Sequence, residues 1–162
     1  HSLSFVLDDT ENSSFRDAYC EVMLQGYDPP KEIFRTISFG DTPRMAKKLG
    51  TLIRSGRKTA TTSLKWSYQH QEEPYPKIGD VYVVLNGRGI PLAVIQNTDV
   101  NIVPFNEVPR EHAEAEGEGD GNLGWWRKIH WKFFSRECKQ LGCTPDPTMP
   151  VVCETFTLLS IL

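Results

Sequence analysis

The chain has 162 residues, 39% of them hydrophobic, and a formal net charge of −3 at pH 7. This length and composition predict one globular domain that folds around a single core without a disulfide or a metal ion. The charge argues against a protein that coats nucleic acid through electrostatics alone. No apolar run approaches the roughly 20 residues of a membrane helix, and no leader pattern opens the chain, so we expect a cytoplasmic protein without membrane contact. The four cysteines lack zinc spacing, and we expect neither a metal nor a cofactor.

The charges are strongly segregated along the chain. Residues 42–71 contain seven bases and no acid, whereas residues 106–120 contain six acids and one base. Such segregation can build a local positive patch on an acidic protein. The solvated faces of two helices would give the same pattern, and the sequence leaves both interpretations open.

The first part of the chain predicts two helices and a strand. Apolar residues at helical spacing follow Ser13-Ser14, which indicates an amphipathic helix that ends near Gly26. Asp41 or Thr42 before Pro43 is typical of a helix start, and Gly56 can end that second helix. The short β-branched run from Thr59 to Leu64 then predicts a strand.

The rest of the chain alternates between strands and helices. Prolines and a glycine predict a loop over residues 68–79, followed by strands at Val81–Leu85 and Ile90–Val103 around a turn at residues 86–89. A short helix from Asn106 to Ala115, a glycine-rich loop, a helix from Leu123 to Leu141 and a strand from Val151 to Leu162 complete the chain. A few unevenly spaced strands among helices predict an α+β domain built around a small curled sheet or barrel.

One candidate for chemistry is the segment from Gly56 to Ser63, in which two cations precede four hydroxyl residues. A neutral lysine can accept the proton of a hydroxyl nucleophile, provided that its pKa falls from about 10.4 to about 7–8. Lys58 and Thr61 would point to opposite faces of a continuous strand, so they can share a pocket only if Lys58 lies in the turn before it. A cation that ends a helix and threonines on an exposed strand explain the same residues without any function.

The acidic glycine-rich segment over residues 112–121 is a second candidate. Its carboxylates are suited to acid/base work, and its glycines allow close backbone approach to a ligand. The alternation of Glu and Gly lacks the ligand spacing of an EF-hand, so calcium is a weak interpretation. A solvated acidic loop remains the alternative.

The third candidate is the run Trp125–Trp131, in which aromatic residues alternate with bases. Such residues can stack on nucleobases and hold phosphates, although aromatic residues at helical spacing more often belong to a core. Trp125 and Trp126 point about 100° apart on a helix, so one can be buried while the other faces a cleft.

Together these segments resemble the ASCH (activating-signal-cointegrator homology) domain family. The resemblance lies in Phe39–Pro43, in Gly56–Thr61 and in Glu116–Asp120 with the tryptophan helix that follows. It covers residues 31–162, implies a PUA-like curled sheet or barrel with flanking helices, and leaves residues 1–30 as an N-terminal helical extension. The order of the segments and the longer helix are similar to the larger bacterial subgroup of the family.

The resemblance also implies a set of site residues. PUA-like domains commonly bind RNA or modified bases, so the implied partner is RNA or a modified nucleoside or nucleotide. Small bacterial relatives hydrolyse the acetyl group of N(4)-acetylcytidine with a lysine, a threonine and a glutamate, which match Lys58, Thr61 and Glu116. The chain departs from these relatives by its inserted glycines and acids after Glu116 and by its tryptophan-rich helix. Glu118 is therefore an alternative to Glu116.

Three functions follow from these residues. In an amidohydrolase, Thr61 would attack the amide carbonyl, Lys58 would accept its proton and Glu116 would assist the leaving amine. In a binding module without chemistry, Arg57, Lys58 and Lys65 would contact phosphate, and a base would stack on an aromatic ring. The candidates for that ring are Trp66, Tyr68, Trp125 and Trp126. A ribonuclease, with Lys58 stabilising the phosphorane charge, is the third.

Overall fold

A computed structural model of the chain describes residues 4–7, 20, 23, 34–40 and 42–162. Except for residues 20 and 23, the helix that we expected between Ser13 and Gly26 lies outside the described residues. Within the proposed extension of residues 1–30, the structure shows a strand that the sequence did not predict, β1 (Ser4–Leu7), which pairs with β2 (Phe34–Phe39).

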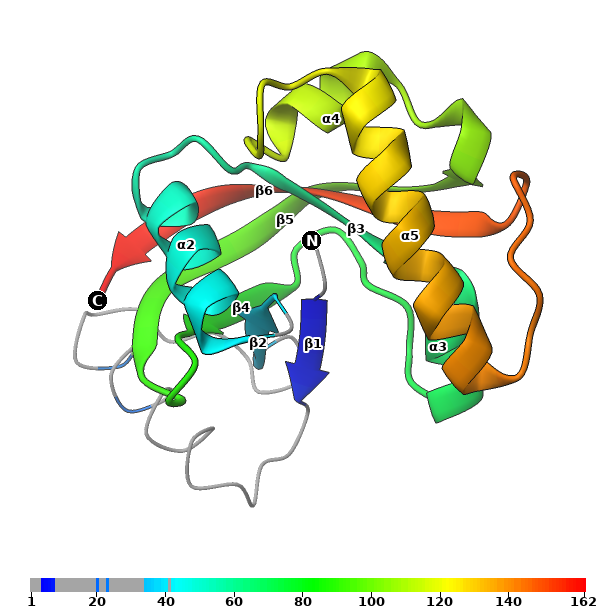
Figure 1. Cartoon of the computed structure of the whole chain (residues 1–162). Coiled ribbons are helices and arrows are strands. Elements are labelled where there is room, and N and C mark those ends of the chain that lie inside the picture. Colours follow the sequence, from blue (N-terminus) through cyan, green and yellow to red (C-terminus); the bar gives the residue numbers. More distant parts are fainter. Residues whose placement is uncertain (1–3, 8–19, 21–22, 24–33, 41) are drawn as a thin grey trace.

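Six strands form one mixed sheet in the order β1-β2-β4-β5-β6-β3. The strands after β2 are β3 (Ala60–Leu64), β4 (Val81–Leu85), β5 (Pro91–Pro104) and β6 (Pro150–Ile161). Only the β2–β4 pair is parallel among the five described pairs. The sheet curls until its edge strands β1 and β3 come into contact, which gives it an inner and an outer face (Figure 1). An α+β architecture around a curled sheet is therefore confirmed.

The inner face packs against α2 (Pro43–Arg54), which the sequence predicted correctly. Thr42 caps this helix by accepting the N–H of Met45 at 3.1 Å, and Pro43 occupies its first turn. Leu49 and Ile53 recur at helical spacing and are fully buried against Ile37 and other apolar residues of β2, β4 and β5. This packing fixes where the chain leaves α2 on its way to β3.

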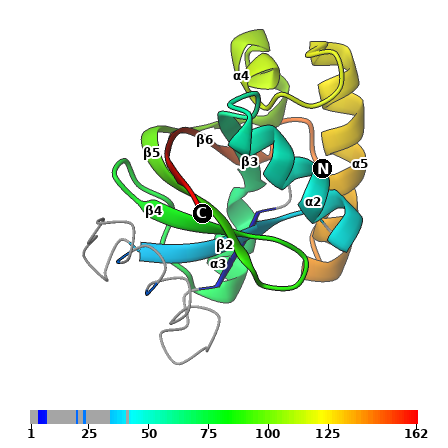
Figure 2. The ribbon, with the colours of Figure 1, turned by 90° about the vertical axis from the view of Figure 1, so that its left-hand side faces the viewer.

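The outer face carries α4 (Arg110–Ala115) and α5 (Leu123–Leu141), which stand together at one side of the sheet (Figure 2). Trp126, Phe134 and Cys138 of α5 bury one side of that helix against Leu64 of β3 and Val151 of β6. The predicted boundaries of α5 are confirmed. Its first turn is capped by Asn122, and it ends at Gly142 with a φ of 76°.

Two parts of the chain differ from the sequence prediction. Residues 65–71 form a helix, α3 (Lys65–Gln71), so the predicted loop is wrong at its start. The single helix expected from Asn106 to Ala115 is divided into a 3-10 turn, η1 (Phe105–Glu107), and α4. The physical reason for the division is Pro109, because proline removes an N–H donor and disfavours helical geometry in the residue before it.

Candidate functional site

Lys58 lies in the connection between α2 and β3, two residues before the strand begins. The chain turns sharply after α2, where Gly56 has a φ of 80° and the N–H groups of Arg57 and Lys58 both donate to Leu52 O. The geometric condition set by the sequence is thus met, because Lys58 is outside the alternation of β3. Only 1% of Lys58 is exposed.

The ammonium group of Lys58 has three acceptors around it. Lys58 Nζ donates to Ala60 O at 2.8 Å and lies 3.4 Å from a carboxylate oxygen of each of Glu116 and Glu118. It also lies 5.6 Å from the centre of the Phe39 ring, at the end of β2. A buried cation is therefore held between two acidic side chains that are 58 and 60 residues away in the sequence.

Gly117 allows the two glutamates to flank the lysine. The N–H of Thr59 donates to Ala115 O at 2.7 Å, which ties the end of α4 to the segment before β3. Gly117 then passes so close that a Cβ there would lie 2.3 Å from Arg57 O, and its φ is 70°. A glycine suits both conditions. The residues on either side of it, Glu116 and Glu118, consequently reach Lys58.

Glu116 is fully buried, and side chains from three parts of the chain contact its carboxylate. One oxygen faces Lys58; the other accepts from Thr62 of β3 at 3.0 Å and from the indole N–H of Trp126, and lies 3.4 Å from Nε2 of His130. Burial by itself raises the pKa of Glu116, but His130 and Lys58 more than offset it, so the pKa is well below its usual value. The carboxyl group is therefore ionised at neutral pH.

Thr61 lies on the other side of β3 from Thr62 and faces the inner side of the curl. It stands directly opposite Glu154 in the antiparallel pair of β3 and β6. Glu154 in turn accepts from Tyr82 Oη of β4 at 3.1 Å and from Asn97 Nδ2 of β5 at 2.8 Å. Phe39 shares this inner face, since residues 35, 37 and 39 alternate with their neighbours and Arg35 pairs with Tyr82. Lys58 Nζ lies beside the Phe39 ring of this face and also reaches Glu116, whose other oxygen accepts from Thr62 on the outer face.

Glu154 is the second buried carboxyl group of this region. The hydrogen bonds from Tyr82 and Asn97 both reach Oε2, whereas Oε1 is buried and has no hydrogen-bond partner in the part of the chain that the structure describes. Burial raises the pKa of Glu154 to about 7, against the smaller effects of Asn97 and Tyr82. Around neutral pH this group is thus able to carry a proton next to Thr61.

The remaining candidates for ligand binding are spread over several places. Arg57 is exposed at the turn before Lys58. Lys65 is half-buried over the ring of Tyr75, and Trp66 packs against the core under α5. Tyr68 is buried with its hydroxyl 2.8 Å from Ser63 Oγ. The structure therefore gives Lys65, Trp66 and Tyr68 partners of their own, apart from the Lys58 cluster.

The two adjacent tryptophans divide as the helical geometry predicts. Trp126 is 2% exposed and donates to Glu116, whereas Trp125 is 38% exposed. The Trp125 ring covers Gly119, because a Cβ on that glycine would come within 3.1 Å of it. Trp125 thus packs on the loop that carries Glu118.

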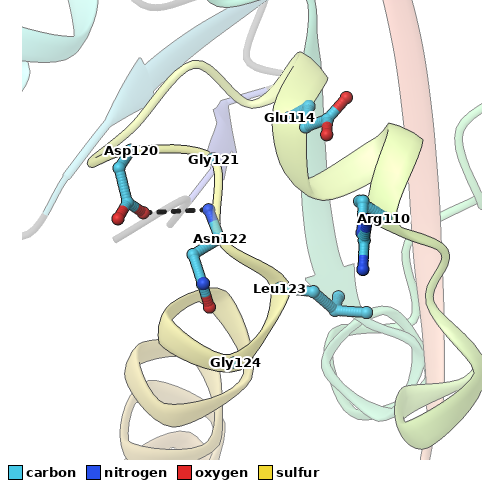
Figure 3. Close-up of a pocket in the computed structure, with 7 residues that line it drawn as sticks. All are labelled: Arg110, Glu114, Asp120, Gly121, Asn122, Leu123 and Gly124. Atoms are coloured by element: carbon cyan, nitrogen blue, oxygen red, sulfur yellow. Dashed lines mark hydrogen bonds between the residues drawn. The ribbon is translucent and has the colours of Figure 1, made fainter.

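A polar pocket of about 370 Å³ opens beside the same loop (Figure 3). Asp120 accepts the N–H of Asn122 at 2.9 Å, and Asn122 in turn caps α5, so the loop enters the helix through two consecutive side-chain contacts. The residues that line it are Arg110, Glu114, Asp120, Gly121, Asn122, Leu123 and Gly124. None of the three proposed catalytic residues is among them.

Sequence reasoning named Lys58 and Trp126 but assigned no role to Thr62, His112 or His130 beside Glu116, or to the group around Glu154. The signal for His112 is its spacing, four residues before Glu116 and thus on the same helical face; its Nε2 lies 2.7 Å from Thr62 Oγ1. Glu154 also left a signal, as a charge within an apolar strand segment that begins at Val151. The partners Tyr82 and Asn97 left none, because only the sheet order brings them together.

Among the described residues, no group of three or more His, Cys, Asp and Glu side chains is placed to hold a metal ion. Within those same parts of the chain, no helix has the length and hydropathy needed to span a bilayer.

Comparison with known proteins identifies the family. The model of the ASCH domain matches residues 35–160. A crystal structure of an ASCH domain from Lactobacillus crispatus is 32% identical with a TM-score of 0.82, over 94% of this chain and 98% of that one. A protein from Enterococcus faecalis V583 is 33% identical with a TM-score of 0.79, over 91% and 89% of the two chains. No curated protein matches the chain significantly in sequence.

These similarities agree with the curled sheet and the flanking helices. They support an RNA-related domain of PUA-like α+β fold at the level of the family. The chain belongs to the ASCH domain family.

Proposed function

We propose that the chain is an amidohydrolase that removes the acyl group from N(4)-acylated cytosine in a nucleoside or in RNA. One observation carries the proposal: Lys58 is buried between two carboxylates, and its Nζ is bonded to the carbonyl of the peptide that joins Ala60 to Thr61. A buried lysine with acidic partners beside a hydroxyl residue is suited to nucleophilic acyl transfer.

Thr61 is the nucleophile in this proposal. Its hydroxyl oxygen attacks the amide carbonyl carbon, and the hydroxyl proton passes to the neutral amine of Lys58. The amine is made available by transfer of a proton from Lys58 to Glu118, whose carboxylate oxygen is 3.4 Å away. Loss of the exocyclic amine of cytosine, which takes the proton from Glu118, leaves an acyl ester on Thr61 that water hydrolyses.

Glu116 and Glu118 have different roles in this scheme. Glu116 is a poor proton donor, because its pKa is lowered and its carboxylate is held by Thr62, Trp126 and His130. We therefore assign it as a positioning residue that holds Lys58. Glu118 lies on the glycine-rich loop at the other side of Lys58 and is the group that exchanges protons. This assigns to Glu118 the part that the family resemblance gives to Glu116.

The test is acetate release from N(4)-acetylcytidine and from an oligoribonucleotide that contains it. We expect Thr61→Val to lower turnover at least about 100-fold, Thr61→Ser to retain part of it, and Glu118→Gln to lower it as well. Thr59→Val is the matched control, because it removes a hydroxyl two residues away that bonds only to Ala115 O among the described contacts. Absence of turnover by the unmodified chain, or full turnover by Thr61→Val, would contradict the proposal.

A binding module without chemistry is the second candidate. It is favoured by the three acceptors around Lys58 Nζ, which match the three protons of an ammonium group and would make the cluster a structural support. In that case the chain binds the acetylated oligonucleotide in the same assay without releasing acetate.

A further inference from the structure

The outer side of α5 carries a cationic stripe, which we define as Lys128, Lys132, Arg136 and Lys139. Their spacings of four, four and three residues place them on one side of the helix over about 17 Å, and all four are exposed. The only acid of α5 is Glu137, which is half-buried and accepts a hydrogen bond from Ser67. α5 thus carries the four exposed bases of the stripe against this single, half-buried acid.

Folding does not require this stripe. The opposite side of α5 supplies the core contacts, through residues such as Trp126 and Phe134. Like charges four residues apart repel one another, whereas alternating acids and bases would have stabilised the helix. The stripe is therefore a cost to the helix that a partner of opposite charge would offset.

An apolar groove of about 400 Å³ adjoins the stripe and shares Lys128 with it. Trp131 lines the groove, half-buried, with its ring centre 5.7 Å from that of Phe105. Arg127 borders the groove and donates to Asn106 O at 3.2 Å, which holds its guanidinium at the rim. Cations beside an accessible aromatic ring are the combination that binds single-stranded nucleic acids, whose bases stack while their phosphates pair with the cations.

We propose that the cationic stripe and the adjoining groove form a docking surface for single-stranded RNA. Phosphates lie along Lys128, Lys132 and Arg136, and one base stacks on Trp131. The N-terminal end of α5 leads to the Lys58 cluster, because Trp125 packs on Gly119, next to Glu118. In Figure 1 this end of α5 lies beside the glycine-rich loop that follows α4.

A second cationic helix face provides an internal comparison. Arg44, Lys47, Lys48 and Arg54 of α2 are also exposed. The groove that is lined by Trp131 borders α5, so the proposal assigns RNA to α5 and expects α2 to contribute only through general attraction.

The experiment measures the fluorescence anisotropy of a labelled 12-nucleotide, unstructured oligoribonucleotide at several salt concentrations. The test variant is Lys128→Glu/Lys132→Glu, and the matched control is Lys77→Glu/Arg88→Glu, whose residues are exposed next to β4. Each pair of reversals changes the net charge from −3 to −7. We expect the test variant to bind at least about tenfold more weakly. The slope of its log affinity against log salt concentration should be smaller by about 1.4, because each of two lost phosphate contacts contributes about 0.7 to the slope.

The control and the α2 variant Lys47→Glu/Lys48→Glu should stay within about twofold to threefold of the unmodified chain. Trp131→Leu should weaken binding about fivefold or more with an unchanged salt slope, because it removes stacking alone. Equal losses in all three charge variants would overturn the proposal in favour of bulk charge. Two further results would overturn the proposal. No binding of RNA by the unmodified chain would point to an acidic protein as the partner, and preference for duplex RNA of the same length would point to recognition of duplex shape.

This surface and the proposed hydrolase are tested separately. Anisotropy needs no turnover, so a chain that binds through α5 without releasing acetate disproves only the hydrolase. A chain that hydrolyses free N(4)-acetylcytidine but does not bind the oligonucleotide disproves only the docking surface.

Discussion

Two buried carboxyl groups lie on opposite sides of β3 and differ in almost every respect except burial. Glu116 is 0% exposed and Glu154 is 1% exposed. The pKa of Glu116 is well below its usual value, whereas burial raises the pKa of Glu154 to about 7. The comparison shows that burial sets the cost of a charge, and that the partners decide whether the charge is kept.

The partners account for the difference. Glu116 has Lys58 on one oxygen and three donors on the other, including His130. Glu154 has two neutral donors on a single oxygen, and Asp80 nearby raises its pKa further. The outer side of β3 is thus built to stabilise a negative charge, and the inner side, where Thr61 stands, favours a neutral acid.

Glu116→Gln removes the charge of the first buried carboxyl group. We expect the free energy of unfolding to fall by about 3–5 kcal/mol, because the buried Lys58 loses one of its two carboxylate partners and His130 loses the carboxylate beside it. The measurement is urea unfolding at pH 7. Glu114→Gln on the exposed side of α4 is the control and should change stability by less than about 0.5 kcal/mol. Similar values for the two variants would show that the grip on Glu116 does not stabilise the fold.

The two carboxyl groups give the stability of the fold opposite dependences on pH. A carboxyl group whose pKa is raised by folding keeps its proton at a pH where the unfolded chain has lost it. Glu154 therefore makes the free energy of unfolding fall as the pH rises from about 4.5 to about 7. Glu116 acts oppositely, since its lowered pKa gives stability above pH 4.5 that is lost on acidification.

Glu154→Gln isolates the first effect. We compare the free energy of unfolding of the variant with that of the unmodified chain at each pH. This difference should favour the variant by about 3 kcal/mol more above pH 7 than at pH 4, because burial raises the pKa of Glu154 from 4.5 to about 7. Unfolding curves at pH 4, 6 and 8 test this. Parallel pH profiles for the two proteins would mean that Glu154 is already ionised at pH 6.

Gly117→Ala tests how Glu116 is placed, through a difference of about 1–3 kcal/mol from its control. Gly56→Ala is a matched control, because both glycines have positive φ. A Cβ on Gly117 would lie 2.3 Å from Arg57 O, whereas a Cβ on Gly56 would have no atom within 4 Å. The control should lose about 1–2 kcal/mol from its backbone conformation. Gly117→Ala should lose about 1–3 kcal/mol more through the clash, as measured by thermal unfolding. Equal losses would show that the loop shifts without cost.

Much of the fold was predictable because its signals are local. The capping residues Thr42 and Asn122, and the apolar periodicity behind them, mark α2 and α5. β4 and β6 are marked by their β-branched residues. The strands β1 and β2 were missed because their pairing with each other and with β4 joins distant parts of the chain, and α3 was missed because no side chain caps its start.

The candidate site was only partly predictable. The family resemblance pointed to Lys58 and Glu116, and the helical geometry separated Trp125 from Trp126. No local rule indicates that Thr62 grips Glu116 while Thr61 faces Glu154, since this depends on which face of β3 meets α4 and α5.

The sequence by itself determined the α+β class, the position of most helices and strands, and the residue types available for chemistry, because caps, turns and periodicity act over a few residues. The tertiary structure decided which residues meet. Lys58 and Glu116 are 58 residues apart, and Tyr82 and Glu154 are 72 apart. Their contacts require the pairing of β6 with both β5 and β3, and the same pairing decides that one buried glutamate is ionised while the other holds a proton up to about pH 7.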